Sequence, residues 1–280
     1  MLGAIIGDIV GSVYEFNNIK TTEFELFTEK SHFTDDTVMT IAVAAGLWRG
    51  YDNVLETKKA LIDSMRYYGR RFAYAGYGGR FAKWLISQDP VPYDSYGNGA
   101  AMRVSSVAWI YNNLEEIEKY AEVTASVTHN HPEGIKGAKS VAAAIFLART
   151  GKTLDDIKSY ITTQYGYDLS RTLDEIRPNY KFYESCQESV PEAITAFLES
   201  NSFEDSLRKS VSIGGDSDTI AAITGSIAEA FYGGIPEWIV KEAISRLDEP
   251  LYDIYQMHQS FLHIKFRWHR HDQAKLCNIS

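Results

Sequence analysis

The sequence predicts a mainly α-helical protein built as one compact multi-helix domain over residues 1–280. Apolar residues recur at helical spacing along most of the chain, whereas strand-like alternation with tight hairpin turns is nearly absent. No Ser/Pro-rich linker, shift in composition or repeat of fixed period divides the chain. With 280 residues, of which 45% are hydrophobic, the chain can bury roughly three quarters of the surface exposed on unfolding.

The helices follow from the period of the apolar residues, and the loops follow from clusters of Gly, Pro, Asn and Asp. The expected helices span 2–14, 37–49, 54–68, 100–113, 115–127, 134–149, 190–200, 203–211, 218–232 and 237–247. Loops are expected at 17–33, 86–99, 163–184 and 212–217. Two of these loops flank acidic motifs.

Composition restricts the possible partners. Lys and Arg number 28 against 37 Asp and Glu, which gives a net charge of −9 and no long basic block, so a nucleic-acid partner is not expected. The two cysteines, Cys186 and Cys277, occur in no metal-ligand spacing and are interpreted as free thiols of a reducing compartment.

The first apolar segment is interpreted as a structural helix of a cytoplasmic protein. It lacks the basic head of a signal peptide and carries Asp8 inside. No apolar run approaches the roughly 18 residues that span a membrane. Gly3, Gly7 and Gly11 lie four residues apart, which aligns them on one helix face that can accept another backbone at close range. Glu15 follows on the same row.

Two acidic motifs precede apolar helices. In "HFTDDTVMTIAVAAG" the acids are Asp35 and Asp36, and in "GGDSDTIAAITGSIAEAF" they are Asp216 and Asp218. Helix capping explains one acid at each helix start, but two exceed what capping requires. Four carboxylates brought together repel unless they are protonated or neutralised by cations, and oxygen ligands suit Mg²⁺ or Mn²⁺ better than Zn²⁺. Spacing alone leaves both a two-metal site and separate caps open.

Two pairs of glycines precede candidate site segments: one pair comes before the second acidic motif and the other before the helix expected at 100–113. Gly214 and Gly215 permit a positive φ and a close approach of the backbone to a ligand. Gly97 and Gly99 precede a helical run, where free N–H groups can face an anion or where the chain simply turns.

Five stretches together resemble the ADP-ribosylglycohydrolases, in the family's order and over most of the chain. The stretches are "GAIIGDIVGSVYEF" at 3–16, "FTDDTVMT" at 33–40, "YGNGAAMRV" at 96–104, "THNHPEGIKGA" at 128–138 and "GGDSDTIAAITGSIAEAFYG" at 214–233. The resemblance implies an all-α orthogonal bundle with two Mg²⁺ or Mn²⁺ ions in a cleft.

The resemblance also implies roles for individual residues. Catalysis would fall to Glu15, which approaches the metals and the scissile bond, and to Asp36. The metal ligands would be Thr34, Asp35, Asp36, Asp216, Asp218 and Thr219. The ligand-binding residues would be Gly97, Asn98, Gly99, Met102, His129, Gly214, Gly215 and Ser217. Ser217 stands where many members have Thr. None of the five stretches covers loops 17–33 and 163–184, which by the resemblance help to set the leaving-group specificity.

The expected function is metal-dependent hydrolysis of the bond between ADP-ribose and a modified acceptor, with arginine on protein as the first choice by family analogy. Two alternatives stay open. One is hydrolysis of free conjugates such as O-acetyl-ADP-ribose, and the other is an ADP-ribose-binding or toxin-immunity protein without turnover. A monomer is expected.

Three further segments are interpreted conservatively. "THNHPE" at 128–133 is a loop or cap rather than a nuclease metal pair, because the basic surface of a nuclease is missing. The aromatic run at 67–84 is interpreted as core packing with surface arginines, with stacking on a base as the alternative. "FLHIKFRWHRHD" at 261–272 is interpreted as a solvated C-terminal segment rather than a zinc site.

Overall fold

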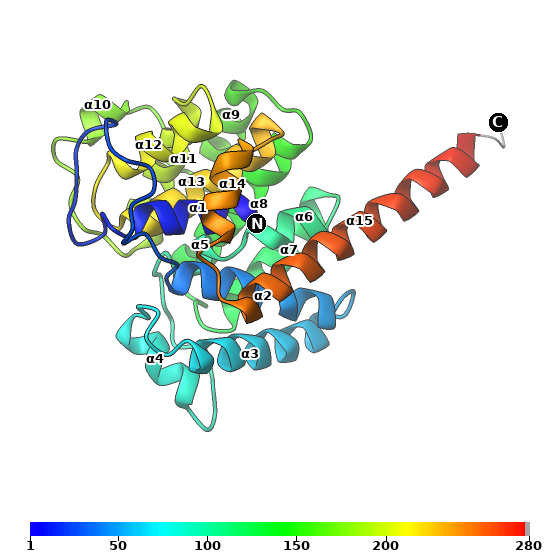
Figure 1. The fold of residues 1–280 in the computed structure, drawn as a ribbon. Coiled ribbons are helices and arrows are strands. Elements are labelled where there is room, and N and C mark those ends of the chain that lie inside the picture. Colours follow the sequence, from blue (N-terminus) through cyan, green and yellow to red (C-terminus); the bar gives the residue numbers. More distant parts are fainter. Residues whose placement is uncertain (278–280) are drawn as a thin grey trace.

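The structure is a computed structural model that describes the backbone of residues 1–277 and the side chains of residues 1–264 (Figure 1). Its helices are α1 (Leu2–Gly11), α2 (Asp35–Arg49), α3 (Val54–Arg71), α4 (Gly79–Ile86), α5 (Gly99–Met102), α6 (Ser105–Ile110), α7 (Leu114–Ser126), α8 (Pro132–Arg149), α9 (Leu154–Tyr165), α10 (Leu173–Ile176), α11 (Cys186–Leu198), α12 (Phe203–Val211), α13 (Ser217–Tyr232), α14 (Glu237–Ile244) and α15 (Glu249–Cys277). Over the described backbone, β-pairing is limited to one isolated bridge between Gly97 and Ser185. The predicted all-α class is confirmed.

Most expected helices are present within a few residues of their predicted bounds. The prediction of one continuous helix over 100–113 was wrong. This segment is divided into α5 and α6 at Arg103 and Val104. Arg103 is buried, and its guanidinium donates a hydrogen bond to Thr128 Oγ1 at 2.7 Å. The break therefore coincides with an arginine side chain that is held inside the protein.

Four helices were missed: α4, α9, α10 and α15. Capping boxes start both α9 and α10, with Thr153 paired to Asp156 and Thr172 paired to Glu175, so a sequence signal was present.

The segment 261–272 lies within α15. The possible zinc ligands His269 and His271 and the Cys277 thiol lie outside the described side chains, while Cys186 is a buried free thiol.

Helices α1 and α13 touch through their backbones, as the glycine row predicted (Figure 1). A Cβ atom added to Gly3 would lie 2.1 Å from the carbonyl oxygen of Gly225, and one added to Gly7 would lie 2.0 Å from that of Ala221. At Gly11 the added atom would lie 2.4 Å from Asp218 Cα. No side chain other than hydrogen fits at these positions, so the row sets the distance between the two helices.

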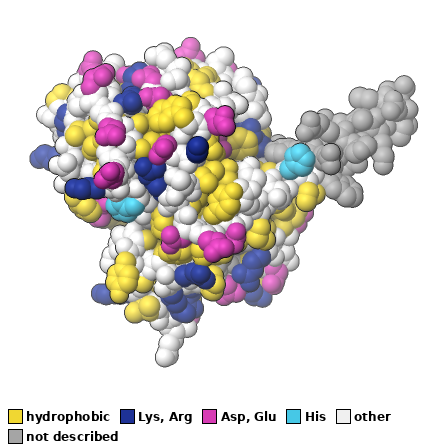
Figure 2. Space-filling view, viewed as in Figure 1, with side chains coloured by type: hydrophobic (Ala, Val, Ile, Leu, Met, Phe, Trp, Pro, Cys, Tyr) yellow, Lys and Arg dark blue, Asp and Glu magenta, His cyan; other side chains and the backbone are white. Residues whose placement is uncertain are grey.

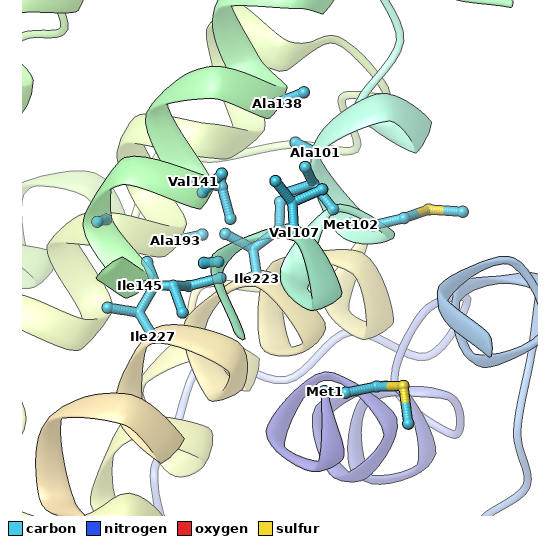
Figure 3. Packing of buried hydrophobic residues seen from close by; sticks show 14 of the residues in the cluster. Met1, Ala101, Met102, Val107, Ala138, Val141, Ile145, Ala193, Ile223 and Ile227 are labelled. Carbon is cyan, nitrogen blue, oxygen red and sulfur yellow. The ribbon is translucent and has the colours of Figure 1, made fainter. Parts of the chain in front are cut away.

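A hydrophobic cluster continues from this contact through the other central helices. Figure 3 shows side chains of α5, α6, α8, α11 and α13 that point toward one another, among them Ala101, Val107, Val141, Ile145, Ala193, Ile223 and Ile227. The cluster includes residues from Met1 to Leu262. This continuity agrees with the expected single domain over 1–280, which stays a prediction.

Helix α2 packs against both α3 and α15, and all three helices contribute residues to the same cluster (Figure 1). Trp48 of α2 stacks on His258 of α15 with ring centroids 5.5 Å apart, and its indole N–H donates to His258 Nδ1 at 3.1 Å.

On the face seen in Figure 2, acidic and basic side chains are interspersed. No helix in the described part of the chain is long and apolar enough to cross a membrane.

Replacing Gly7 by Ala should destabilise the protein by about 3 kcal/mol or more, because the methyl group would meet the α13 backbone and force the helices apart. Urea unfolding measures this change. Gly234→Ala is the matched control, since no atom lies within 4 Å of the added Cβ there. Equal stability of the two variants would contradict the backbone contact.

Buried His258 should make the protein sensitive to acid. Burial lowers the pKa of His258 to about 3, below the ordinary value of 6.5. The unfolded chain therefore binds the proton more readily, so stability is full above pH 6.5 and declines between pH 6.5 and 3. Between pH 7.5 and pH 5 this residue should remove about 2 kcal/mol of unfolding free energy.

In His258→Phe the difference in unfolding free energy between pH 7.5 and pH 5 should shrink by that amount, whatever the variant's absolute stability. Denaturant titrations at the two pH values measure it. Replacing the exposed His32 by Gln serves as the control for losing a histidine. An unchanged pH difference in His258→Phe would show that His258 is not responsible.

Candidate active site

Carboxylates from both ends of the chain converge where α1 meets α13. One carboxylate oxygen from each of Glu15, Asp216 and Asp218 lies within 4.8 Å of the other two. Asp216 and Asp218 are buried, and Glu15 is partly exposed. The close contact of the α1 glycines with α13 therefore places Glu15, which follows on the same helix face, at the start of α13.

Asp8 of α1 holds the start of α2 in place. Its buried carboxylate accepts hydrogen bonds from the Thr34 backbone N–H at 2.9 Å, from Thr34 Oγ1 at 2.7 Å and from the Thr37 N–H at 3.0 Å. An acid on one helix therefore caps the N-terminus of another, which fixes where Asp35 and Asp36 lie. The sequence analysis missed this role, and the only signal was a lone acid inside an apolar helix.

Asp36 has a buried carboxylate oxygen that accepts no hydrogen bond from the described residues. It is 3% exposed, its Oδ2 accepts from Thr219 Oγ1 at 3.1 Å, and its Oδ1 has no hydrogen-bond partner. Burial, followed by the charge of Asp218, raises the pKa of Asp36 well above its ordinary range. Burial also raises the pKa values of Asp35 and Asp218, followed by the charge of Asp218 for Asp35 and the charge of Asp216 for Asp218. A buried, unpartnered carboxylate oxygen beside other carboxylates calls for a cation.

The donor set fits a hard divalent cation. The groups that converge offer carboxylate and hydroxyl oxygens, which are the ligands that Mg²⁺ and Mn²⁺ prefer. Over residues 1–264, no ion pair involves Asp35, Asp36, Asp216 or Asp218, so no Lys or Arg neutralises them. Bound divalent cations would supply the positive charge that balances these carboxylates.

Asn98 positions Asp216. Its Nδ2 donates to Asp216 Oδ2 at 2.6 Å and to Ser189 Oγ at 3.1 Å, while burial raises the pKa of Asp216 to about 6. The Asn98 N–H also donates to the Glu184 carbonyl oxygen at 2.8 Å. The amide that was expected to bind ligand is therefore largely committed to holding a carboxylate.

Glu15 lies in a strongly acidic environment. Burial, followed by the charge of Asp218, raises its pKa to about 8. Asn18, in the loop between α1 and α2, donates to the Glu15 carbonyl oxygen at 2.8 Å and also to the Gly215 carbonyl oxygen at 2.9 Å. The Gly215 N–H donates back to Asn18 Oδ1 at 2.8 Å. One side chain thus ties the backbone of Glu15 to that of the residue before Asp216.

The carboxylates open into a cavity of about 290 Å³. The predicted site residues that line it are Glu15, Asp35, Asp36, Gly97, Asn98, Gly99, Met102, His129, Asp216, Asp218 and Thr219. Thr34, Gly214, Gly215 and Ser217 do not line it. The Ser217 hydroxyl donates to the Gly11 carbonyl oxygen at 3.2 Å, which turns it toward α1. Gly214 and Gly215 have φ of 73° and 75°, so they shape the turn that precedes α13.

The His129 ring lines the cavity and packs against the turn at Gly97 and Gly99. A Cβ atom added to either glycine would lie 3.4 Å or 3.3 Å from His129 Nε2, so the ring packs closely against this turn. The Thr128 hydroxyl lies 2.7 Å from His129 Nδ1 and accepts from Arg103. Burial, followed by the charge of Arg103, lowers the pKa of His129 well below its ordinary value, which keeps the imidazole neutral.

Several cavity residues escaped the sequence analysis. They are Gly76, Gly78, Gly79, Arg80, Phe81, Tyr93, Ser95, Phe182 and Glu184. Arg80 and Phe81 belong to the aromatic run that was interpreted as core packing. The Arg80 guanidinium lies 4.9 Å from the centroid of the Tyr93 ring and donates to the Tyr93 carbonyl oxygen. Arg80 is therefore the basic side chain at the cavity wall.

Comparison with known proteins agrees with this geometry. A model of the ADP-ribosylglycohydrolase family matches residues 1–266. The ADP-ribosylhydrolase ARH3 of Mus musculus is 29% identical, with 83% of this chain and 82% of that protein covered. The ADP-ribosylarginine hydrolase Tri1 of Pseudomonas putida (strain GB-1) is 26% identical, with 90% of this chain and 76% of that protein covered.

Solved structures show the same fold. The structure described as "ADP-ribosylglycohydrolase-related protein complex" superposes with a TM-score of 0.65 at 23% identity, covering 90% of this chain and 94% of that one. The family model covers nearly the whole chain, including every motif that contributes to the carboxylate cluster. This chain therefore belongs to the ADP-ribosylglycohydrolase family of enzymes.

Proposed function

We propose that this glycohydrolase cleaves the bond between the distal ribose of ADP-ribose and a modified acceptor with the help of two Mg²⁺ or Mn²⁺ ions. The observation that carries the proposal is the buried Oδ1 of Asp36, which has no partner among the described residues and on which the charges of other carboxylates, Asp218, Asp8, Asp35 and Asp216, act. Such an arrangement is unfavourable without cations and suited to two of them.

The proposed metal ligands are Thr34, Asp35, Asp36, Asp216, Asp218 and Thr219. Five of them line the cavity, and Thr34 lies behind it with its hydroxyl donating to Asp8, so only its remaining lone pair is available. Bound divalent ions would fix the ribose hydroxyls and a water molecule and would stabilise charge that develops at the anomeric carbon. Asp8 and Asn98 hold these ligands in place.

Glu15 is the proposed general acid/base. It lies at the cavity wall beside Asp218 and is less buried than the aspartates, so it can reach both a bound substrate and water. Cleavage of a glycosidic bond needs a proton for the leaving group or the removal of one from water. Gly97, Asn98, Gly99, Met102 and His129 would line the ADP-ribose, while Gly214, Gly215 and Ser217 act indirectly through the turn before α13.

Arginine on protein is the proposed acceptor, in line with the name of the relative Tri1, an ADP-ribosylarginine hydrolase. Serine-linked or free conjugates are the alternatives for the same centre. A purely binding or immunity role is not favoured, because Glu15 and the carboxylate set are complete. The monomeric state, the cytoplasmic location and the absence of a nucleic-acid partner stay predictions.

The direct test is release of ADP-ribose from arginine-, serine- and nucleobase-linked substrates, with Mg²⁺, with Mn²⁺ and with a chelator. Release from at least one substrate, lost on chelation and restored by one of the two ions, is expected. Release that persists unchanged in the chelator would overturn the metal-dependent mechanism.

Asp36→Asn and Asp218→Asn should each lower metal-dependent release by at least about 100-fold, because each removes a charged ligand. Without added metal the same variants should melt at a higher temperature than the natural protein, since one of the repelling charges is gone. Thermal melts with and without Mn²⁺ measure both effects, and Asp63→Asn on the exposed face of α3 is the control. Wild-type activity in Asp36→Asn would remove it from the metal centre.

Glu15→Gln should lower turnover by roughly 10²- to 10⁴-fold while changing the affinity for ADP-ribose only slightly, because the amide keeps the shape but cannot transfer the proton. Single-turnover kinetics and calorimetric titration of ADP-ribose separate the two quantities. Glu23→Gln, in the exposed loop before α2, is the control. A parallel loss of metal affinity would instead identify Glu15 as a metal ligand.

A further inference from the structure

Two phenylalanines stack at the cavity in an exposed position. The ring centroids of Phe16 and Phe182 lie 6.0 Å apart with an interplanar angle of 15°, and Phe182 lines the cavity. Phe16 is 85% exposed and Phe182 is 41% exposed. Neither belongs to the hydrophobic cluster or packs against it. Aromatic rings that are exposed beside a cavity and absent from the core are available to bind a ligand.

A carboxylate that has no ion-pair partner among the described residues lines the same cavity as Phe182. Glu184 follows Phe182 by two residues, lines the cavity and is exposed. None of the ion pairs among the described residues involves its carboxylate. Its backbone is fixed, because the Glu184 carbonyl oxygen accepts from the Asn98 N–H at 2.8 Å.

Glu184 differs from the carboxylates of the proposed metal centre. It does not belong to the group formed by Glu15, Asp216 and Asp218, although its charge acts on Glu15. Arg80, the basic residue at the cavity wall, is placed over the Tyr93 ring and forms no ion pair with Glu184. Glu184 is therefore free to receive a positive charge from a ligand.

We propose that Phe16, Phe182 and Glu184 form the acceptor subsite and select a planar cation, the guanidinium group of an ADP-ribosylated arginine. This inference rests on the proposed glycohydrolase function. A guanidinium stacks on aromatic faces and donates paired hydrogen bonds to a carboxylate. Serine and acetyl acceptors offer neither a plane nor a charge.

The place of the subsite supports this assignment. Phe16 directly follows Glu15, the proposed acid/base, so the aromatic pair lies next to the group that would serve the leaving nitrogen. Phe182 and Glu184 lie in the segment that joins α10 to α11. The subsite therefore combines Phe16, which follows the proposed acid/base, with two residues of the segment between α10 and α11.

The test compares kcat/KM for ADP-ribosyl-arginine with kcat/KM for ADP-ribosyl-serine and O-acetyl-ADP-ribose. Glu184→Gln and Phe182→Leu should each lower the arginine value by about tenfold and change the neutral substrates less than about twofold. The loss in Glu184→Gln should diminish at high salt, because the lost interaction is ionic. Glu23→Gln removes an equal charge away from the cavity and should change neither.

The outcomes separate the two proposals. If the natural protein releases ADP-ribose from no conjugate with either metal, the proposed function fails. If it is active but Glu184→Gln and Phe182→Leu lower all substrates equally, or lower none, the subsite proposal fails while the function stands. Retained activity on a neutral conjugate also shows that each variant is folded.

Discussion

The backbone contact between α1 and α13 is the constraint on which the site depends. Because Gly3, Gly7 and Gly11 carry no side chain, the two helices approach closely enough for Glu15 to reach the acids at the start of α13. Asp8, on the same helix, caps α2 and so adds the third acidic segment. A single short helix therefore sets the relative positions of all the groups proposed to act in catalysis.

Much of the fold follows from local sequence, and the exceptions have physical causes. Helices with one apolar face were predicted close to their observed bounds, since their period is a property of neighbouring residues. The break between α5 and α6 was not, because it accompanies the burial of Arg103 against Thr128, a contact across the fold. Helices α9 and α10 are weakly apolar, and only their capping boxes marked them.

The site was predictable where its residues lie in recognisable motifs. Asp36 and Asp218 lie in the first turns of two similar apolar helices, α2 and α13, and the likeness of the two sequences indicated one shared centre. Asp8, Asn18 and Glu184 were not predictable, because their roles arise from contacts with segments far away in the chain. Such residues look ordinary in sequence, since nothing local distinguishes a supporting acid or amide from a surface one.

The joining of distant segments also has a consequence for biosynthesis. Thr219 and Asp36, whose side chains meet at 3.1 Å, are separated by 183 positions. During translation the acids near the N-terminus are made long before α13, so the cation-binding site cannot form until most of the chain has been synthesised. Binding of the proposed cations would thus be a late event, because a nascent chain that ends before α13 carries only part of the proposed ligand set.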